Sequence, residues 1–499
     1  MAIDSRADGH SLRPTAPLLP GQHVVIIGAG PAGLTAGYVL SKQGVRTTIL
    51  ESDDVVGGLS RTAQYKEFRF DIGGHRFFTK YEPVQALWEE ILGDEFISVP
   101  RLSRIYYDGK FFDYPLKAGN ALKGLGLVNA MLIVASFIKW RWRPYPVEDN
   151  FEQWVTNRFG KRLFEVFFKT YTEKVWGVPC TEIRAEWAAQ RIQNLSLEKA
   201  ILSAASLNRR KTSIKTLITE FRYPRLGPGE MWEMCRQRME QMGNEVLLNH
   251  RVSAIEMRQG RVVAVCAQTP HGPQRFPAHH VISSAPLRAL VHTLDPQAPA
   301  EVTAAANGLK YRDFLTVALI VGRDKLFQDN WIYIHSPGVK VGRIQNFNNW
   351  SQALVPVPHK TCLGLEYFCF QGDGLWETSD DQLIDLAKRE LEHLGLASAR
   401  DVEDGAVVRM PKAYPIYDSF YHDHLDTIRR FIDPIPNLHT VGRNGMHKYN
   451  NQDHSMLTAM MTLWNMQGAS YDVWSVNTDF DYHEEQKIAD RPSLAVASA

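Results

Sequence analysis

His23-Val-Val-Ile-Ile-Gly28-Ala29-Gly30-Pro31-Ala32-Gly33 is the stretch that decides the fold. Its four apolar residues predict a buried strand. Its three glycines predict a tight turn, a close backbone approach to a pyrophosphate, and close packing of the next helix on the sheet. That helix begins near Pro31 and directs its N-terminal N–H groups and positive dipole end at the pyrophosphate. We therefore expect a dinucleotide at this turn, in contact with Gly28, Gly30, Ala32 and Gly33.

A second predicted strand, residues 46–51, ends on an acid. Glu51 lies 18 residues beyond Gly33, where a carboxylate can accept a hydrogen bond from a ribose hydroxyl. The acid alone does not separate NAD from FAD. The following Gly57-Gly58-Leu59-Ser60-Arg61-Thr62 resembles the extended FAD signature of amine oxidase and protoporphyrinogen oxidase type flavoproteins. FAD is therefore the expected cofactor, with Gly58, Leu59 and Ser60 among its contacts.

A later segment carries a second FAD cue. Val252-Ser-Ala-Ile255 and Arg261-Val-Val-Ala-Val265 predict a strand pair, and Val281-Ile-Ser-Ser-Ala285-Pro286 predicts a strand that ends in small residues. This arrangement resembles the second FAD-contacting segment of the same superfamily and makes Val252 a candidate contact. An ordinary β-hairpin is the alternative.

The charge and cysteine composition of the chain exclude several classes of protein. The 56 basic and 55 acidic residues give a formal net charge of +1, so the chain carries no electrostatic footprint for nucleic acid. The five cysteines show no CxxC spacing, so neither a disulfide scaffold nor a metal site is indicated. Residues 1–20 carry charges and prolines but no apolar core, which indicates a disordered leader rather than a signal peptide. We expect a cytoplasmic protein with a flexible tail over residues 483–499.

The most apolar stretch, residues 125–140, is shorter than the roughly 20 residues that span a bilayer. No transmembrane segment is therefore expected. We expect a buried helix here. The alternative is a membrane-surface segment supported by Lys139, Arg141 and Arg143.

The pattern along the chain predicts an α/β protein with an interrupted cofactor domain. We expect a Rossmann-type, glutathione reductase-like FAD-binding domain made of residues 21–104, 239–290 and 425–475. Bulky apolar residues three and four apart in 159–171 and 186–207 predict a helical insert over 105–238. Branched and aromatic residues in 314–322 and 361–370 predict an antiparallel β-sheet substrate domain over 291–424, with a helix at 380–394.

Two clusters in the first half carry candidate site chemistry. Gly73-Gly74-His75 lets the backbone approach a flat ring and could place His75 beside the reactive edge of a flavin; a glycine turn with a structural histidine is the alternative. Tyr171-Thr-Glu-Lys174-Val-Trp176-Gly-Val-Pro179, followed by Trp187 and Arg191, combines aromatic rings with a cation and suits a stacked base and a phosphate. A packed helical core is the alternative there.

Two further clusters lie in the second half. Trp331-Ile-Tyr333 and Gly342-Arg343-Ile-Gln-Asn346-Phe-Asn348-Asn349-Trp350 suit a pocket wall or an exposed sheet edge. Leu438-His-Thr-Val441-Gly442-Arg443 runs into the polar string Asn451-Gln-Asp-His-Ser455, and a helix over 456–466 places a second N-terminus near the flavin. The irregular spacing of its histidines argues against a metal site.

Together these clusters resemble UDP-galactopyranose mutase, particularly its eukaryotic-type branch. The likeness runs from Gly21 to about Trp464. The family's Gly-Gly-His loop matches residues 73–75, and its Lys-Val-Trp-x-Val-Pro run matches 174–179. Its C-terminal polar string, the most specific feature because ordinary amine oxidases lack it, matches Gly442, Arg443, Gly445, Lys448, Tyr449 and residues 451–455.

The resemblance implies a flavin-dependent isomerase acting on a sugar nucleotide, with NADH or NADPH as the initial reductant. Reduced FAD would attack the anomeric carbon through N5, the nucleotide diphosphate would leave, and the sugar would reclose with a different ring size through a flavin N5–sugar adduct. The resemblance assigns catalysis to His75, Arg191, Arg343 and Tyr449. It assigns cofactor contacts to Gly74, His75, Gly442, Arg443, Ser455 and Met456. It assigns substrate contacts to Trp176, Trp187, Arg191, Tyr333, Arg343, Asn348, Trp350, Tyr449 and Asn451.

Two other functions share these motifs. An FAD-dependent oxidoreductase of the amine oxidase, protoporphyrinogen oxidase or phytoene desaturase type would have the same fold and a more apolar tunnel. A non-catalytic flavin-binding or partner-binding protein is the third reading. The sugar and the oligomeric state stay open at the level of sequence.

Overall fold

The computed structural model describes residues 21–114, 118–185 and 219–477. The expected leader, the expected tail, the predicted helix over 186–207, Trp187 and Arg191 lie outside these ranges. Within them, no helix is long and apolar enough to cross a membrane.

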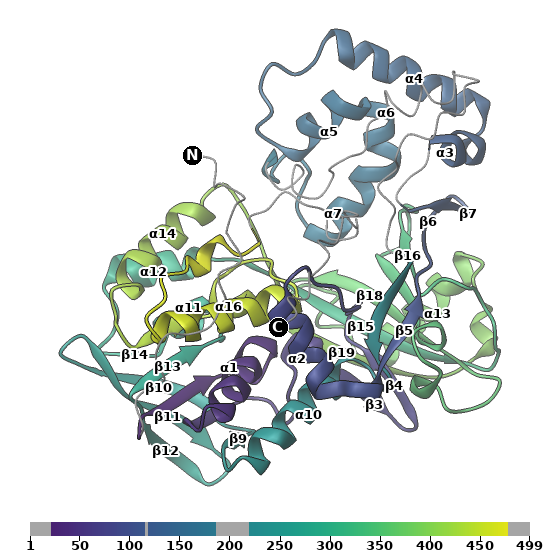
Figure 1. Ribbon diagram of the computed structural model, residues 1–499. Coiled ribbons are helices and arrows are strands. Elements are labelled where there is room, and N and C mark those ends of the chain that lie inside the picture. The colour runs from purple at the N-terminus through teal and green to yellow at the C-terminus, as the bar shows by residue number, and fades with distance from the viewer. Residues whose placement is uncertain (1–20, 115–117, 186–218, 478–499) are drawn as a thin grey trace, which may run out of the picture.

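A parallel sheet forms the centre of the lower left part of the molecule in Figure 1. Its three central strands are almost fully buried because helices or further strands cover both faces. The order is β20 (Leu438–Thr440), β13 (His280–Ser283), β1 (His23–Ile27), β2 (Arg46–Leu50) and β9 (Glu245–Leu247). The order shows that segments from three distant parts of the chain build one sheet.

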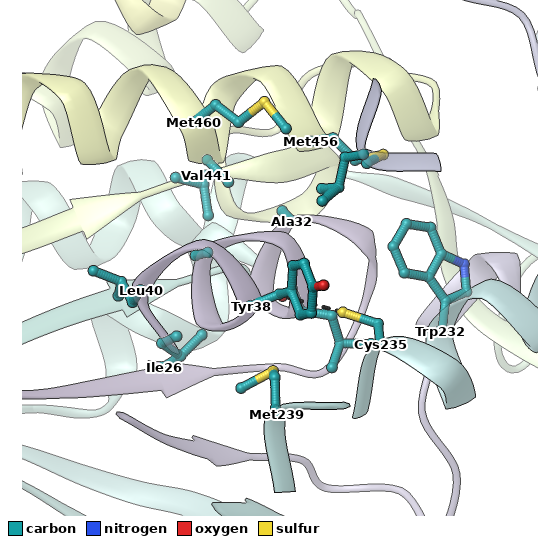
Figure 2. Close-up of a cluster of buried hydrophobic side chains, with 14 of the residues drawn as sticks. Ile26, Ala32, Tyr38, Leu40, Trp232, Cys235, Met239, Val441, Met456 and Met460 are labelled. Atoms are coloured by element: carbon teal, nitrogen blue, oxygen red, sulfur yellow. Dashed lines mark hydrogen bonds between the residues drawn. The ribbon is translucent and has the colours of Figure 1, made fainter. Parts of the chain in front are cut away.

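Three helices cover one face of this sheet: α1 (Pro31–Lys42), α10 (Pro228–Gln241) and α16 (Gln452–Met466). Figure 2 shows their common core, where Met456 and Met460 of α16 lie above α1, and Trp232, Cys235 and Met239 of α10 lie beside it. The α2 helix (Glu82–Leu92) joins this core. The glycine turn therefore sits on a rigid support.

The other face is covered by an antiparallel layer and three helices. In this layer β12 (Gly272–Pro277), β11 (Arg261–Thr269) and β10 (Arg251–Arg258) pair antiparallel, and the short β14 (Leu294–Asp295) pairs parallel with β10. The helices are α11 (Leu287–His292), α12 (Ala300–Gly308) and α14 (Tyr421–Ile432), which share one apolar core with the layer.

A seven-stranded sheet forms the second half. Its order is β19 (Val402–Pro415), β15 (Tyr311–Val321), β18 (Thr361–Cys369), β17 (Arg343–Asn346), β16 (Trp331–Ile334), β6 (Ser103–Tyr107) and β7 (Lys110–Asp113). Neighbouring strands run antiparallel except β16 and β6. The α13 helix (Asp380–His393) packs on it. Two short pairs, β3 (Thr62–Tyr65) with β4 (Phe68–Asp71) and β5 (Phe96–Pro100) with β8 (Glu220–Pro224), complete the strands.

The helical lobe at the top of Figure 1 contains α3 (Ala118–Leu125), α4 (Leu127–Trp142), α5 (Phe151–Phe159), α6 (Lys161–Leu163) and α7 (Thr170–Trp176). Between α6 and α7 the segment Phe164–Lys169 is π-helical. Not all of the described residues of the insert expected over 105–238 belong to this lobe. At one end of that range β6 and β7 join the large sheet, and at the other α10 joins the cofactor core, because long-range pairing and packing decide the membership of such short segments.

Candidate functional site

The glycine turn after β1 is too tight for larger residues. A Cβ on Gly28, which has a φ of +96°, would lie 2.4 Å from Ser284 Oγ. A Cβ on Gly33 would lie 1.9 Å from the Gly28 carbonyl oxygen. Gly30 and Gly58 face each other, with 4.0 Å between a Cβ built on Gly30 and the Gly58 Cα. Two stretches of backbone without side chains thus approach the same space, which is what a pyrophosphate needs.

Glu51 is held against this turn. Its Oε2 accepts a hydrogen bond from the Ala29 amide at 2.7 Å, and its Oε1 accepts one from the Asp53 amide at 3.0 Å. These bonds fix the carboxylate just beyond the carboxyl end of β2, where ligands bind in open parallel sheets.

A cavity of about 1430 Å³ runs from the turn to the large sheet and the helical lobe. Most of the residues that the sequence nominated line it: Gly28, Gly30, Ala32, Glu51, Gly58, Leu59, Ser60, Gly74, His75, Trp176, Val252, Tyr333, Arg343, Trp350, Gly442, Arg443, Tyr449, Asn451 and Ser455. The structure therefore brings motifs from four regions of the chain to one space.

Of the nominated residues that the structure describes, three are not among those lining the cavity. Gly33 packs inside the turn. Asn348 uses its amide to hold β18, donating to the Lys360 carbonyl and accepting from the Cys362 amide. Met456 lies in the core, where its sulfur accepts a hydrogen bond from Trp88. The side chains of Asn348 and Met456 are engaged elsewhere and Gly33 has none, so the direct contacts expected of these three residues stay predictions.

Trp350 lines the cavity although little of its surface is exposed. It is almost fully buried, packs against Phe221 and Tyr223, and donates its indole N–H to the Asn330 carbonyl. These contacts hold Trp350 in place in the cavity wall.

A buried ion pair fixes the cation in the cavity wall. Both Nε and Nη2 of Arg343, on β17, lie 2.6 Å from Oε2 of Glu366 on the neighbouring β18. Gln345 donates to the other carboxylate oxygen at 2.6 Å. Burial alone would lower the pKa of Arg343, but Glu366 and nearby tyrosines raise it well above its ordinary value. Arg343 therefore stays charged, with its guanidinium about 3.5 Å from a Cβ built on Gly74.

Aromatic rings surround this cation. Tyr414 stacks on Tyr449 with 5.5 Å between ring centroids, and Trp176 lies 6.3 Å from Tyr449. Tyr171 stands edge-on to Tyr333 at 5.7 Å. Burial raises the pKa of Tyr171 well above its ordinary value, so its hydroxyl keeps its proton. The wall offers stacking surfaces and hydroxyl groups beside one fixed positive charge.

His75 lies between two arginines. Burial lowers its pKa to about 3, and the charges of Arg443 and Arg343 add to the shift. The imidazole is therefore neutral at pH 7. Arg443 donates to the carbonyls of Asn450 and Ala413 and lies over the Tyr449 ring, 4.8 Å from its centroid. These bonds fix the orientation of its guanidinium.

Two buried amide oxygens are consistent with a polar ring ligand. Asn444 Oδ1 and Gln452 Oε1 belong to residues that line the cavity, and neither oxygen has a hydrogen-bond partner in the part of the chain that the structure describes. Buried acceptors of this kind are normally satisfied. With the glycine turn and Glu51 they fit a bound dinucleotide flavin. No group of three or more metal-binding side chains occurs among the described residues.

Sequence reasoning missed Tyr414 and Glu366 as site residues, and it placed Tyr171 in a candidate cluster without assigning it a role. Glu366 could have been identified from the sequence, because it is the single acid in an otherwise apolar strand, Thr361–Cys369. A buried acid needs a positively charged or hydrogen-bonding partner. Tyr171 opens the run that includes Trp176. Tyr414 carries no local motif.

The fold and site define a flavoprotein, and the comparisons agree. The chain matches the family model of flavin containing amine oxidoreductases over residues 31–451, and it belongs to that family. Its fold is similar to that of reduced UDP-galactopyranose mutase, with a TM-score of 0.80, 21% identity, and coverage of 93% of this chain and 97% of the other. A putative protoporphyrinogen oxidase from Exiguobacterium sp. 255-15 gives a TM-score of 0.68 with 17% identity, covering 90% of this chain and all of the other (100%).

Sequence relatives match over shorter stretches. L-amino acid oxidase Cdc18 from Crotalus durissus cumanensis is 45% identical over 64 residues, which is 13% of either chain. A probable UDP-galactopyranose mutase from Klebsiella pneumoniae is 27% identical over 171 residues, which is 33% of this chain and 43% of that protein. The chain thus aligns with less than half the length of these relatives.

Proposed function

We propose that this protein is an FAD-dependent, mutase-like isomerase that interconverts the pyranose and furanose forms of a UDP-sugar or a related sugar nucleotide. The observation that carries the proposal is Arg343, held by the buried Glu366 and directed at the Gly74–His75 loop. A cation fixed in this way suits a departing diphosphate, whereas a tunnel for apolar substrates does not require it. The similarity of fold to UDP-galactopyranose mutase supports the same choice.

In this proposal, different parts of the cavity bind the cofactor and the substrate. FAD would lie along Gly28, Gly30, Glu51 and Val252, and its reduced form supplies a nucleophile for the anomeric carbon. The parallel sheet with its antiparallel β10–β12 layer is consistent with a glutathione reductase-like FAD-binding domain. NADH or NADPH would provide the initial reduction.

The wall around the reacting sugar would hold the substrate and stabilise the leaving group. Arg343 would neutralise the diphosphate, and Tyr449 would hydrogen-bond it. His75, being neutral, can form a hydrogen bond at the flavin edge without adding charge. Trp176 and Tyr333 would pack against the nucleotide and keep water out.

The test uses the reduced holoprotein and a panel of sugar nucleotides that includes UDP-galactofuranose. We expect chromatography to show ring interconversion with at least one member of the panel. Borohydride added during turnover should leave a sugar covalently retained on the released flavin. The Arg343→Lys variant serves as the matched comparison, because it keeps the charge but cannot form the bidentate pair with Glu366. No interconversion across the panel, together with hydrogen peroxide release from an amine or a porphyrinogen, would establish the oxidoreductase reading instead.

A further inference from the structure

The outward face of α4 carries a row of large apolar side chains. Leu127 is 76% exposed, Met131 57% and Trp142 83%, and Val128, Leu132 and Ile138 are exposed between them. The opposite face buries Ala130, Ile133 and Phe137 against α5 and α6. The helix expected to be buried is therefore covered on one side only. Scattered apolar residues are normal on a surface, but a contiguous row of this size marks a contact site.

The charged residues within and beside this row in the sequence are all basic. Between Asp113 and Glu148 the sequence contains five basic residues, Lys117, Lys123, Lys139, Arg141 and Arg143, and no acidic residue. Lys139, Arg141 and Arg143 are exposed at the C-terminal end of α4, where Trp140 and Tyr145 stack on each other. Of the next three acids along the chain, Glu148 and Glu152 form ion pairs with Arg158 and Lys161, and Asp149 is exposed.

We propose that the outward face of α4 docks the protein on an anionic lipid bilayer, with the helix lying in the plane of the headgroups. Its 16 residues extend over about 24 Å, less than the roughly 30 Å hydrocarbon core, so the helix rests on the membrane rather than crossing it. The apolar row enters the boundary between headgroups and acyl chains. Lys139, Arg141 and Arg143 lie where lipid phosphates are, and Trp142 occupies the interface that tryptophan favours.

Charge complementarity selects this occupant over a second copy of the chain. A twofold contact through α4 would bring the basic ends of two identical patches into one interface. An anionic bilayer offers the opposite charge and an apolar layer beneath it. In Figure 1, α4 lies at the outer edge of the lobe, so no other described element stands between it and a flat surface. The inner side of the same lobe lines the cavity with Phe151, Phe167 and Tyr171, so docking would hold the cavity close to the bilayer.

Vesicle flotation of the holoprotein tests the proposal. We expect it to float with vesicles of phosphatidylcholine and phosphatidylglycerol in equal parts and to stay unbound with phosphatidylcholine alone. Removing one charge by Lys139→Gln should weaken binding about fivefold. The double variant Met131→Glu/Leu132→Glu should lose binding while keeping its flavin content. Met242→Glu, at the exposed end of α10 in the other half of the molecule, is the matched control and should bind like the wild type.

Three results would overturn the proposal: no flotation of the wild type with anionic vesicles, unchanged flotation of the double variant, or equal binding to both lipid compositions. If vesicles do not bind and light scattering shows a dimer that Met131→Glu dissociates, a second copy covers this face instead. Each outcome is independent of the reaction proposed for the cavity.

Discussion

Asp71 gives a sharp test of the electrostatics beneath the site. It ends β4, immediately before the Ile72-Gly73-Gly74-His75 loop, and its side chain is fully buried. It accepts hydrogen bonds from the hydroxyls of Tyr223 at 2.6 Å and Thr62 at 3.1 Å. Burial raises the pKa of Asp71 to about 7, the charge of Glu366 adds to the rise, and the two hydrogen bonds oppose it.

The raised pKa has a calculable effect on stability. The carboxyl binds its proton more tightly in the folded state than in the unfolded chain, where its pKa is 3.8. The folded state therefore loses stability as pH rises from about 4 to about 7, and the loss is constant above that. A difference of about three pKa units corresponds to roughly 4 kcal/mol. At pH 5 the stability already lost corresponds to about one pKa unit, or roughly 1.5 kcal/mol.

Asp71→Asn should remove this cost. The asparagine carbonyl can accept from Tyr223, and its amide can donate to Thr62 Oγ1. We expect the variant to be more stable than the wild type, with a gain at pH 8 that exceeds the gain at pH 5 by about 3 kcal/mol. Urea unfolding of the holoprotein at both pH values measures the difference.

Asp313→Asn is the matched control, because Asp313 is also buried but accepts from two backbone amides, those of Lys412 and Gln371, at 2.6 Å each. An asparagine at this position would place its side-chain NH2 group opposite one of these two backbone N–H groups, so that two donors would face each other. We expect a loss of about 1–3 kcal/mol at both pH values. A loss of stability in Asp71→Asn at pH 8, or a gain that does not depend on pH, would refute the reasoning, because it would mean that the carboxylate is ionised and needed in the fold.

Three further changes test other parts of the structure. Gly33→Ala places a Cβ 1.9 Å from a carbonyl oxygen and should abolish flavin retention, read as the ratio of flavin to protein absorbance; Gly374→Ala, which meets nothing within 4 Å, should retain it. Arg343→Lys should lower kcat for the ring interconversion about 10²–10³-fold, and a smaller loss would remove Arg343 from the leaving-group role. Glu390→Gln, which disturbs hydrogen bonds from the Lys340 and Val341 amides away from the cavity, should cost about 1–3 kcal/mol in urea unfolding and leave kcat unchanged.

The sequence was most informative where structure and chemistry are both local. The turn at Gly28, the helix after it and the acid at Glu51 follow each other within 30 residues, and each has a short-range physical reason. Strands such as 314–322 and 361–370 were predictable for the same reason, since their composition alone suits a buried sheet.

The order of the strands in the large sheet was not predictable. β6 carries no signal that pairs it with β16, more than 200 residues away, and β7, which pairs with β6, carries none that places it in this sheet rather than in the helical lobe. The residues that surround Arg343 come from β18, β19 and α7, and only the folded sheet makes Glu366 its partner. The apolar composition of residues 125–140 likewise predicted a helix correctly but did not reveal which of its faces the protein covers.

The residues that would position the cofactor and the cation that favours the isomerase lie in different parts of the molecule. The glycine turn, Glu51 and the parallel sheet position a flavin, and a flavin serves oxidases and isomerases alike. The cation that favours the isomerase reading sits on β17 and is held from β18, in a different part of the molecule with its own core. Substitutions at Arg343 and Glu366 should therefore slow the ring interconversion while leaving flavin retention intact, whereas those at Gly33 should abolish flavin retention and, with it, the flavin-dependent reaction. If Arg343→Lys lost its flavin, Arg343 would be needed to hold the cofactor, and its proposed role at the leaving diphosphate would have to be abandoned.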